Sequence, residues 1–155
     1  MKRHLSFMML LALMLSVFSL GFAYTIQVGE GYQSNSCLPV YSGYSYTQQV
    51  YTQSLINYGG VITKIRFYYE YGEIANSKDW TIYLGHTQKT AFNSDTDWEP
   101  ASNLMQVFTG DVSALMPAAH NWLEITLDTP FSYNNTDNLL LAVHQYTPDS
   151  GVGIL

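Results

Sequence analysis

The residues able to do acid–base chemistry are sparse in this sequence. Glu70 and Glu73 flank a Tyr-Gly turn signal, and Glu124 and Asp128 fall on the same side of a predicted strand. Paired carboxylates are the machinery of glycoside hydrolysis. Both pairs lie among polar residues, in positions typical of solvated side chains, so we expect no catalysis from them.

Other catalytic patterns are absent from the sequence. The histidines have no metal-ligand spacing such as His-x-x-x-His, and there is no Gly-x-Ser-x-Gly elbow and no glycine-rich phosphate loop. We therefore expect a protein that is not an enzyme.

One acidic loop has the oxygen-rich composition that calcium prefers. Asn93, Asp95 and Asp97 alternate within five residues, and Ca²⁺ takes 6–8 oxygen ligands. The glycine and distant glutamate of an EF-hand are missing. A structural calcium ion is the one cofactor that the sequence suggests, and an ordinary Asx-rich turn is the alternative that we favour.

The aromatic residues are the second lead, because exposed Trp and Tyr rings have the apolar faces and polar edges that suit sugar rings. Trp98 is expected in a loop between two acidic residues, and Tyr68 and Tyr83 on the outer faces of their strands. These three are the candidate ligand-binding residues. Trp80 alternates with Ile82 and Leu84 and is expected in the core.

Period-two alternation dominates the segments that must position these residues. The inward positions expected are Val61, Ile65, Phe67 and Tyr69, then Trp80, Ile82 and Leu84, then Leu123, Ile125 and Leu127. Residues 138–143 are apolar on both faces, as in a central strand. Residues 105–110 read as a shorter strand, and residues 46–53 as a polar edge strand.

Turn signals at Gly59-Gly60, Thr129-Pro130 and Asn134-Asn135 separate these segments, and no helix long enough for a parallel crossover intervenes. The pattern predicts an all-β fold, an antiparallel β-sandwich or jelly-roll-like domain, with a closed barrel as the alternative architecture. Because a sandwich usually places a further strand beside residues 139–143, we expect the chain to continue beyond Leu155 in a longer protein.

Residues 1–23 carry a basic start at Lys2 and Arg3, an apolar run over 5–20 and a small-x-small end at Ala23. This pattern predicts a cleaved secretory signal peptide rather than a membrane anchor. A β-sandwich module over 24–155 follows, with no further span. Its single cysteine, Cys37, forms no internal disulfide and is expected to be a small apolar residue.

The protein is acidic, with 6 basic and 12 acidic residues and a net charge of −6. It lacks the basic surface that binding to a phosphate backbone requires, so nucleic acid is not an expected partner. We expect a glycan or a surface protein instead.

Six stretches together resemble a known module: 44–52 (YSYTQQVYT), 60–68 (GVITKIRFY), 79–87 (DWTIYLGHT), 97–100 (DWEP), 129–133 (TPFSY) and 137–143 (DNLLLAV). Their order is similar to that of a β-sandwich module in large bacterial surface proteins, which also carry adhesin-like domains, fibronectin type III domains and a type IX secretion sorting domain. The resemblance spans about residues 40–147. It implies a non-catalytic adhesion or interaction module at the cell surface or secreted. The alternative is a carbohydrate-binding module of a secreted hydrolase.

Overall fold

The protein is described by a computed structural model that covers residues 23–29, 44–71, 74 and 77–148. The predictions for residues 1–22 of the signal peptide, for Cys37 and for Glu73 lie outside these described residues. Residues 23–29 are exposed and belong to no helix or strand.

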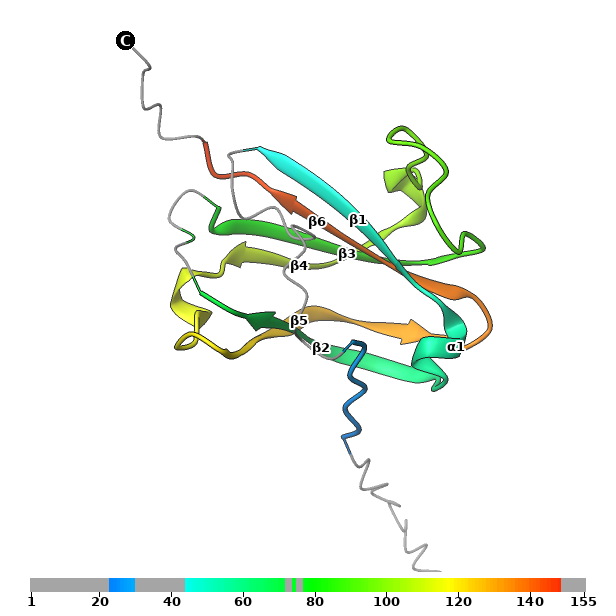
Figure 1. Cartoon of the computed structure of the whole chain (residues 1–155), viewed down its shortest axis with the longest axis horizontal. Helices are drawn as coiled ribbons and strands as arrows, with labels where there is room; N and C mark the ends of the chain where they lie inside the picture. The colour runs from blue at the N-terminus through cyan, green and yellow to red at the C-terminus, as the bar shows by residue number, and fades with distance from the viewer. Residues whose placement is uncertain (1–22, 30–43, 72–73, 75–76, 149–155) are drawn as a thin grey trace, which may run out of the picture.

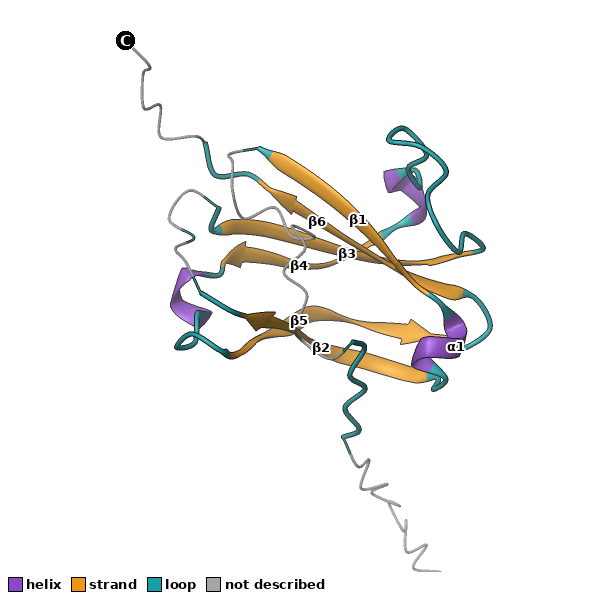
Figure 2. Cartoon of the chain, viewed as in Figure 1, coloured by secondary structure: helices purple, strands orange, loops and turns teal. Residues whose placement is uncertain are grey.

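The described residues form six strands joined by short helices. In chain order the elements are β1 (Ser45–Tyr51), α1 (Gln53–Ile56), β2 (Gly60–Tyr69), β3 (Asp79–Thr87), η1 (Ala101–Asn103), β4 (Met105–Asp111), η2 (Ser113–Leu115), β5 (Asn121–Tyr133) and β6 (Asn138–Gln145). Figure 2 shows the helical turns at the ends of the strands, where they serve as connections. No helix in this described part is long and apolar enough to span a membrane.

The strands make two antiparallel sheets. The first has the order β1-β6-β3-β4, and the second pairs β2 with β5. Figure 1 shows β2 and β5 below the four-stranded sheet in that view, with the connection between β3 and β4 projecting at the upper right. The prediction of an all-β, sandwich-like antiparallel fold is confirmed. β6 is a central strand and β1 an edge strand, as the sequence indicates.

The core lies between the two sheets and follows from the alternation in the sequence. Trp80, which is 2% exposed, packs edge-on against Phe67 of the opposite sheet, with ring centroids 5.9 Å apart. Most of the rest of the buried apolar cluster comes from β3, β4, β5 and β6 and includes Ile82, Leu84, Val107, Leu123, Ile125, Leu127, Leu141 and Val143. Burying a side chain of this size contributes about 1.5–3 kcal/mol. Because no disulfide links the described residues, this packing is the main source of stability.

The prediction that Val61 faces inward is wrong. Val61 is 62% exposed, and its neighbour Ile62 packs against the core instead. The register between β2 and β5 shifts between Ile62 and Lys64. A bulge of this kind reverses the facing of every side chain on one side of it. Ile65, Phe67 and Tyr69, beyond the bulge, keep the inward facing that alternation predicts.

The turn predicted at Thr129-Pro130 is wrong, and these two residues belong to the same irregularity instead. β5 runs through both residues, and four of its residues, 127–130, lie opposite the single β2 residue Thr63. Proline has no N–H to donate to a sheet, so it is tolerated where the pairing is interrupted. The second predicted turn, at Asn134-Asn135, does separate β5 from β6.

Candidate functional site

A row of four aromatic rings crosses the outer face of the four-stranded sheet. Tyr46 on β1 lies directly opposite His144 on β6, and both point away from the core. Trp98 follows on one side, with its ring centroid 5.3 Å from that of Tyr46. The rings of Tyr46 and His144 are 5.6 Å apart, and those of His144 and Tyr146 are 3.8 Å apart. We call these residues, Trp98, Tyr46, His144 and Tyr146, the aromatic row.

Tyr83 lies beside this row on β3. Burial and, next, a hydrogen bond with Tyr146 raise the pKa of Tyr83 to about 12. The phenol therefore stays protonated at physiological pH and holds the Tyr146 side chain in place. Burial likewise lowers the pKa of His144 below its ordinary value of 6.5. The row is thus a neutral surface near pH 7.

The loop from 88 to 104 puts Trp98 at the end of the row. The side-chain amide of Gln48 on β1 forms two hydrogen bonds with the backbone of Glu99. Nε2 donates to the carbonyl oxygen, and Oε1 accepts from the N–H, at 2.9 Å each. These paired bonds anchor the loop backbone next to Trp98 on β1. The Trp98 side chain remains 45% exposed, so its ring is open to a ligand.

The same loop lies close against the outer face of the sheet. A Cβ atom at Gly85 would come within 2.5 Å of the Leu104 side chain and 3.2 Å of the Asn103 carbonyl oxygen. Leu140, the neighbour of Gly85 on β6, points outward and is 0% exposed. The absence of a side chain at Gly85 therefore lets the loop pack on the sheet.

An open hollow of about 430 Å³ lies at the other end of the row, between β3 and β4. Its lining residues are Asp79, Trp80, Thr81, Thr109, Gly110, Asp111 and Tyr146. Tyr146 thus belongs both to the row and to the hollow, and the two features are continuous. The hydroxyls of Thr81 and Thr109 are hydrogen-bonded to each other at 2.9 Å.

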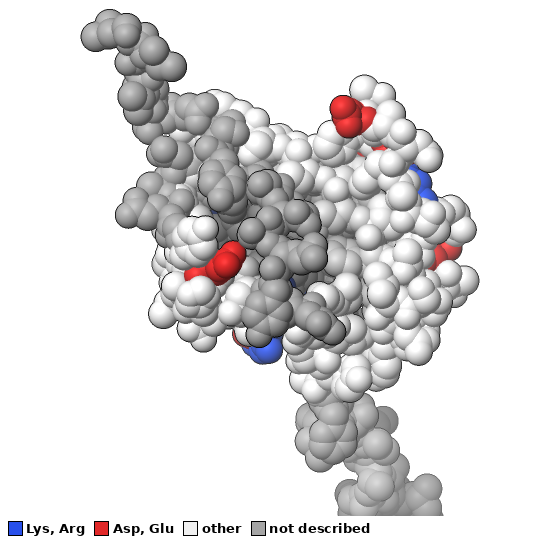
Figure 3. Space-filling view, in the orientation of Figure 1, with Lys and Arg blue, Asp and Glu red and all other residues white. Residues whose placement is uncertain are grey.

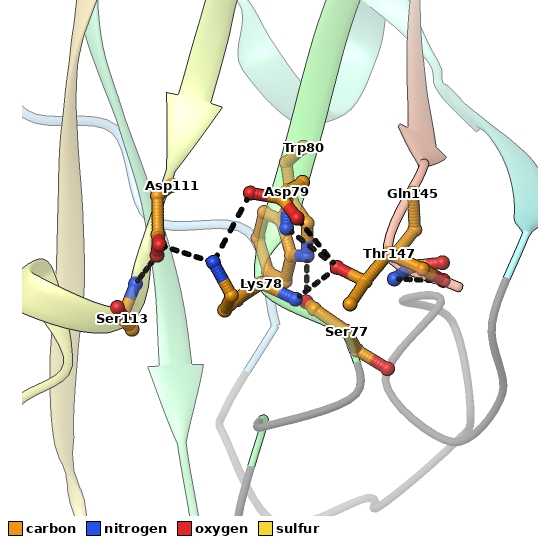
Figure 4. Close-up of polar contacts among 8 residues, drawn as sticks. All are labelled: Ser77, Lys78, Asp79, Trp80, Asp111, Ser113, Gln145 and Thr147. Atoms are coloured by element: carbon orange, nitrogen blue, oxygen red, sulfur yellow. Dashed lines mark hydrogen bonds and ion pairs between the residues drawn. The ribbon is translucent and has the colours of Figure 1, made fainter. Parts of the chain in front are cut away.

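Lys78 lies between the two carboxylates of the hollow, as Figure 4 shows. Its Nζ is 2.5 Å from Asp111 Oδ2 and 3.4 Å from Asp79 Oδ1. Hydrogen bonds from Lys78 and Ser113 lower the pKa of Asp111 to about 2. The hydrogen bond with Asp111 raises the pKa of Lys78. All of these contacts favour the ionised forms.

Thr147 fixes the start of β3 against the end of β6. Its hydroxyl oxygen accepts hydrogen bonds from the backbone N–H groups of Lys78 and Asp79, each at 3.0 Å, and donates to Asp79 Oδ2 at 3.1 Å (Figure 4). The N–H of Tyr146 donates to the carbonyl oxygen of Asp79 at 2.8 Å. These bonds hold Asp79 and Tyr146 at the rim of the hollow.

The structure brings two of the three predicted aromatic residues together and separates the third. Trp98 and Tyr83 both lie on the outer face of the four-stranded sheet. Tyr68 lies on the outer face of β2, where its ring packs edge-on against Trp122 with the centroids 5.4 Å apart. Lys64 and Arg66 beside it both pair with Glu124.

The acidic loop is organised by hydrogen bonds around Asp97. Its carboxylate pairs with Lys89 and accepts hydrogen bonds from the backbone and side-chain N–H groups of Asn93, at 3.0 and 3.1 Å. The bond from Lys89, first, and those from Asn93 lower the pKa of Asp97. Asp95 is exposed. This geometry agrees with the Asx-rich turn, and calcium binding to Asn93, Asp95 and Asp97 stays a prediction. Among the described residues, no group of three His, Cys, Asp or Glu side chains that could hold a metal ion lies together.

Tyr46, His144 and Tyr146 are site residues that the sequence analysis missed. Each lies in or beside a strand in which polar and aromatic residues occupy the outward positions. Tyr44 alternates with Tyr46, and His144 alternates with Tyr146. This outward alternation is the signal that points to them. The pairing of β1 with β6, which are separated by almost the whole domain, is needed to join them into one surface.

Comparisons with known proteins give no relatives. No family model, no curated protein and no solved structure matches the chain significantly.

Proposed function

We propose that this protein is a non-catalytic, exported interaction module whose ligand is a glycan, bound along the outer face of the four-stranded sheet. The observation that carries the proposal is the aromatic row. The centroids of its successive rings are 3.8–5.6 Å apart from Trp98 to Tyr146. Trp98 and Tyr146, at the two ends, are 45% and 43% exposed, so a sugar ring can stack at each end of the row. Tyr and Trp suit such a ligand because one part of the ring is apolar and the edge is polar.

The polar groups around the row support the same class of ligand. The Tyr46 hydroxyl accepts a hydrogen bond from Gln48 at 2.8 Å, and the hydroxyls of Tyr83, Thr81 and Thr109 lie on the same face. Sugars present many hydroxyl groups that donate and accept. Figure 3 shows few charged residues among the described residues in that view, in keeping with a chain in which 12% of residues are charged. A neutral, hydroxyl-rich ligand suits a chain with so few charges, most of them acidic, better than a polyanion.

A glycan array with the protein expressed as residues 24–155 tests this proposal, followed by calorimetry on the best ligand. Trp98→Ala should weaken binding by about 1–3 kcal/mol, since truncating an aromatic side chain that contributes strongly to binding costs this much. The Trp98→Ala variant should keep its fold, because Trp98 lies in a loop and is 45% exposed.

Trp122→Ala is the matched control for Trp98→Ala. Trp122 is 41% exposed and also packs against one tyrosine, but it lies on the opposite sheet. Glycan affinity should be unchanged in this variant. If neither the parent protein nor any variant binds a glycan, or if the two variants weaken binding equally, the proposal is wrong.

Adhesion to a surface protein is the second candidate. It is favoured by the exposed pair of Tyr68 and Trp122 beside the ion pairs of Glu124 with Lys64 and Arg66, because protein interfaces are enriched in aromatic residues and arginine. In that case Trp122→Ala, and not Trp98→Ala, should reduce attachment of the protein to intact cells.

A further inference from the structure

The hollow at the Tyr146 end of the aromatic row has a charge pattern that the row lacks. It is lined by two carboxylates, and Lys78 is the counter-ion of both, so these three groups together carry one net negative charge. The side chains of Asp79 and Asp111 are 44% and 43% exposed, so both can accept hydrogen bonds from an arriving ligand. A site with this charge and these acceptors selects among ligands by their charge.

The ammonium group of Lys78 already has two carboxylate partners. It lies between Asp79 and Asp111, at 3.4 and 2.5 Å. A carboxylate or sulfate that entered the hollow would face two aspartates whose counter-ion is already shared. The net negative charge of the three groups repels such an anion.

The hydroxyls in the hollow complete a site for a neutral sugar. Thr81 and Thr109 use one of their two hydroxyl protons in the bond between them, which leaves one hydroxyl proton to donate and lone pairs to accept. Asp79 and Asp111 accept, and the ring of Tyr146 forms the side wall. Together these groups match a sugar ring whose edge bears hydroxyls and whose face is apolar.

We infer that the hollow is a subsite that receives one uncharged sugar residue by its hydroxyls and makes the protein prefer neutral glycans over glycans that contain uronic acids. This inference rests on the proposed function, since it needs a glycan to lie along the aromatic row. It goes further by assigning the choice of ligand to Asp79, Asp111 and their neighbours.

The test measures the affinity of the parent protein for neutral gluco-, xylo- and manno-oligosaccharides and for oligogalacturonates of matched length. The parent should bind its best neutral ligand at least tenfold more tightly than any oligogalacturonate. Asp111→Asn keeps the shape of the side chain, removes one negative charge and leaves Lys78 with one counter-ion fewer. It should weaken neutral binding by about tenfold, the effect of losing a hydrogen bond to a charged group. It should also reduce the ratio of the affinity for neutral oligosaccharides to the affinity for oligogalacturonates.

Glu124→Gln is the control, because it removes one carboxylate from the opposite sheet; it should change neither affinity. Thr109→Val keeps the β-branched shape, removes one hydroxyl from the hollow and should also weaken neutral binding. If Asp111→Asn fails to fold, the affinity of Thr109→Val for neutral glycans tests the role of the hollow instead.

The outcomes separate the two proposals. A parent protein that binds no glycan overturns both. A parent that binds neutral and acidic glycans equally well, or an Asp111→Asn variant that behaves like Glu124→Gln while Trp98→Ala still loses binding, overturns the role of the hollow and leaves the proposed function in place.

Discussion

His144 lies between two tyrosine rings on the outer face of the four-stranded sheet, and burial lowers its pKa below 6.5. The unfolded chain therefore takes up a proton at this position at a higher pH than the folded protein does. It follows that His144 does not affect stability above about pH 7, and that stability falls as the pH drops below 6.5 toward the lowered pKa. Burial alone sets the direction of this pKa shift, because no ion pair of His144 is among its causes.

We predict that the urea midpoint falls between pH 7.5 and pH 5.5, and that His144→Gln reduces this fall. The carboxylates whose pKa values are lowered, Asp97, Asp111 and Glu124, contribute stability that is lost only at lower pH, below about 4. The interval from pH 7.5 to pH 5.5 therefore lies above the pH range in which these three carboxylates lose their contribution to stability. A variant with the same loss of stability as the parent would show that His144 is not responsible.

At the scale of single residues, the sequence indicates that the candidate site is aromatic, but it does not identify all of the residues that form the site. Trp98 and Tyr83 are recognisable as outward aromatics from their place in a loop and in an alternating strand. The role of Tyr68 as a ligand-binding residue stays a prediction, but its position on the other sheet separates it from them. Alternation shows which way a side chain points, whereas the pairing of strands decides which outward residues meet.

At the scale of elements, Gly85 determines how closely the loop over residues 88–104 packs on the sheet. We predict that Gly85→Ala destabilises the protein by about 1–3 kcal/mol, since an added methyl group would overlap the Leu104 side chain and crowd the Asn103 carbonyl. The displaced loop should also carry Trp98 away from Tyr46 and weaken glycan binding. Urea denaturation and calorimetry measure the two effects.

A double-mutant cycle gives the control for this prediction. Leu104→Ala removes the side chain that the new methyl group would meet, so Gly85→Ala should cost less in that background than in the parent. Residues in direct contact are coupled in this way, whereas independent sites are additive. Additive effects would mean that the loop is not held by this contact.

The strands illustrate what alternation can and cannot predict. β3, β5 and β6 have inward residues as the sequence indicates: Trp80, Ile82 and Leu84 on β3, Leu123, Ile125 and Leu127 on β5, and Leu141 and Val143 on β6 are buried. β2 does not, since a bulge beside Thr63 turns Ile62 inward and Val61 outward. Pro130 marks the same irregularity on β5, but a proline signals a break in hydrogen bonding without showing whether the strand ends or continues. The hydrogen bond that the N–H of Thr109 donates to Asp128 Oδ2, at 3.0 Å, also cannot be predicted from the sequence, although it covers part of the β4 edge.

At the scale of the whole molecule, two sheets of unequal size enclose one apolar core, and the outer face of the larger sheet bears the candidate site. The low content of charged residues and the excess of acidic ones, 12 against 6, agree with a ligand that is not a polyanion. These properties follow from composition, so they were predictable. The continuity of the aromatic row with the hollow depends on the order β1-β6-β3-β4, which no local pattern specifies.

The last prediction concerns export of the whole chain. Expressed with its leader in a bacterium that has a general secretion pathway, the protein should be recovered outside the cytoplasm with Tyr24 as its first residue, because cleavage is expected after Ala23. Removal of the leader should leave the domain intact, since residues 23–29 are exposed and belong to neither sheet. N-terminal sequencing gives the cleavage site, and thermal unfolding of residues 24–155 made without the leader should give the same midpoint as the exported protein. Recovery of Met1 in the mature protein would rule out cleavage, and with it Tyr24 as the first residue of the mature chain.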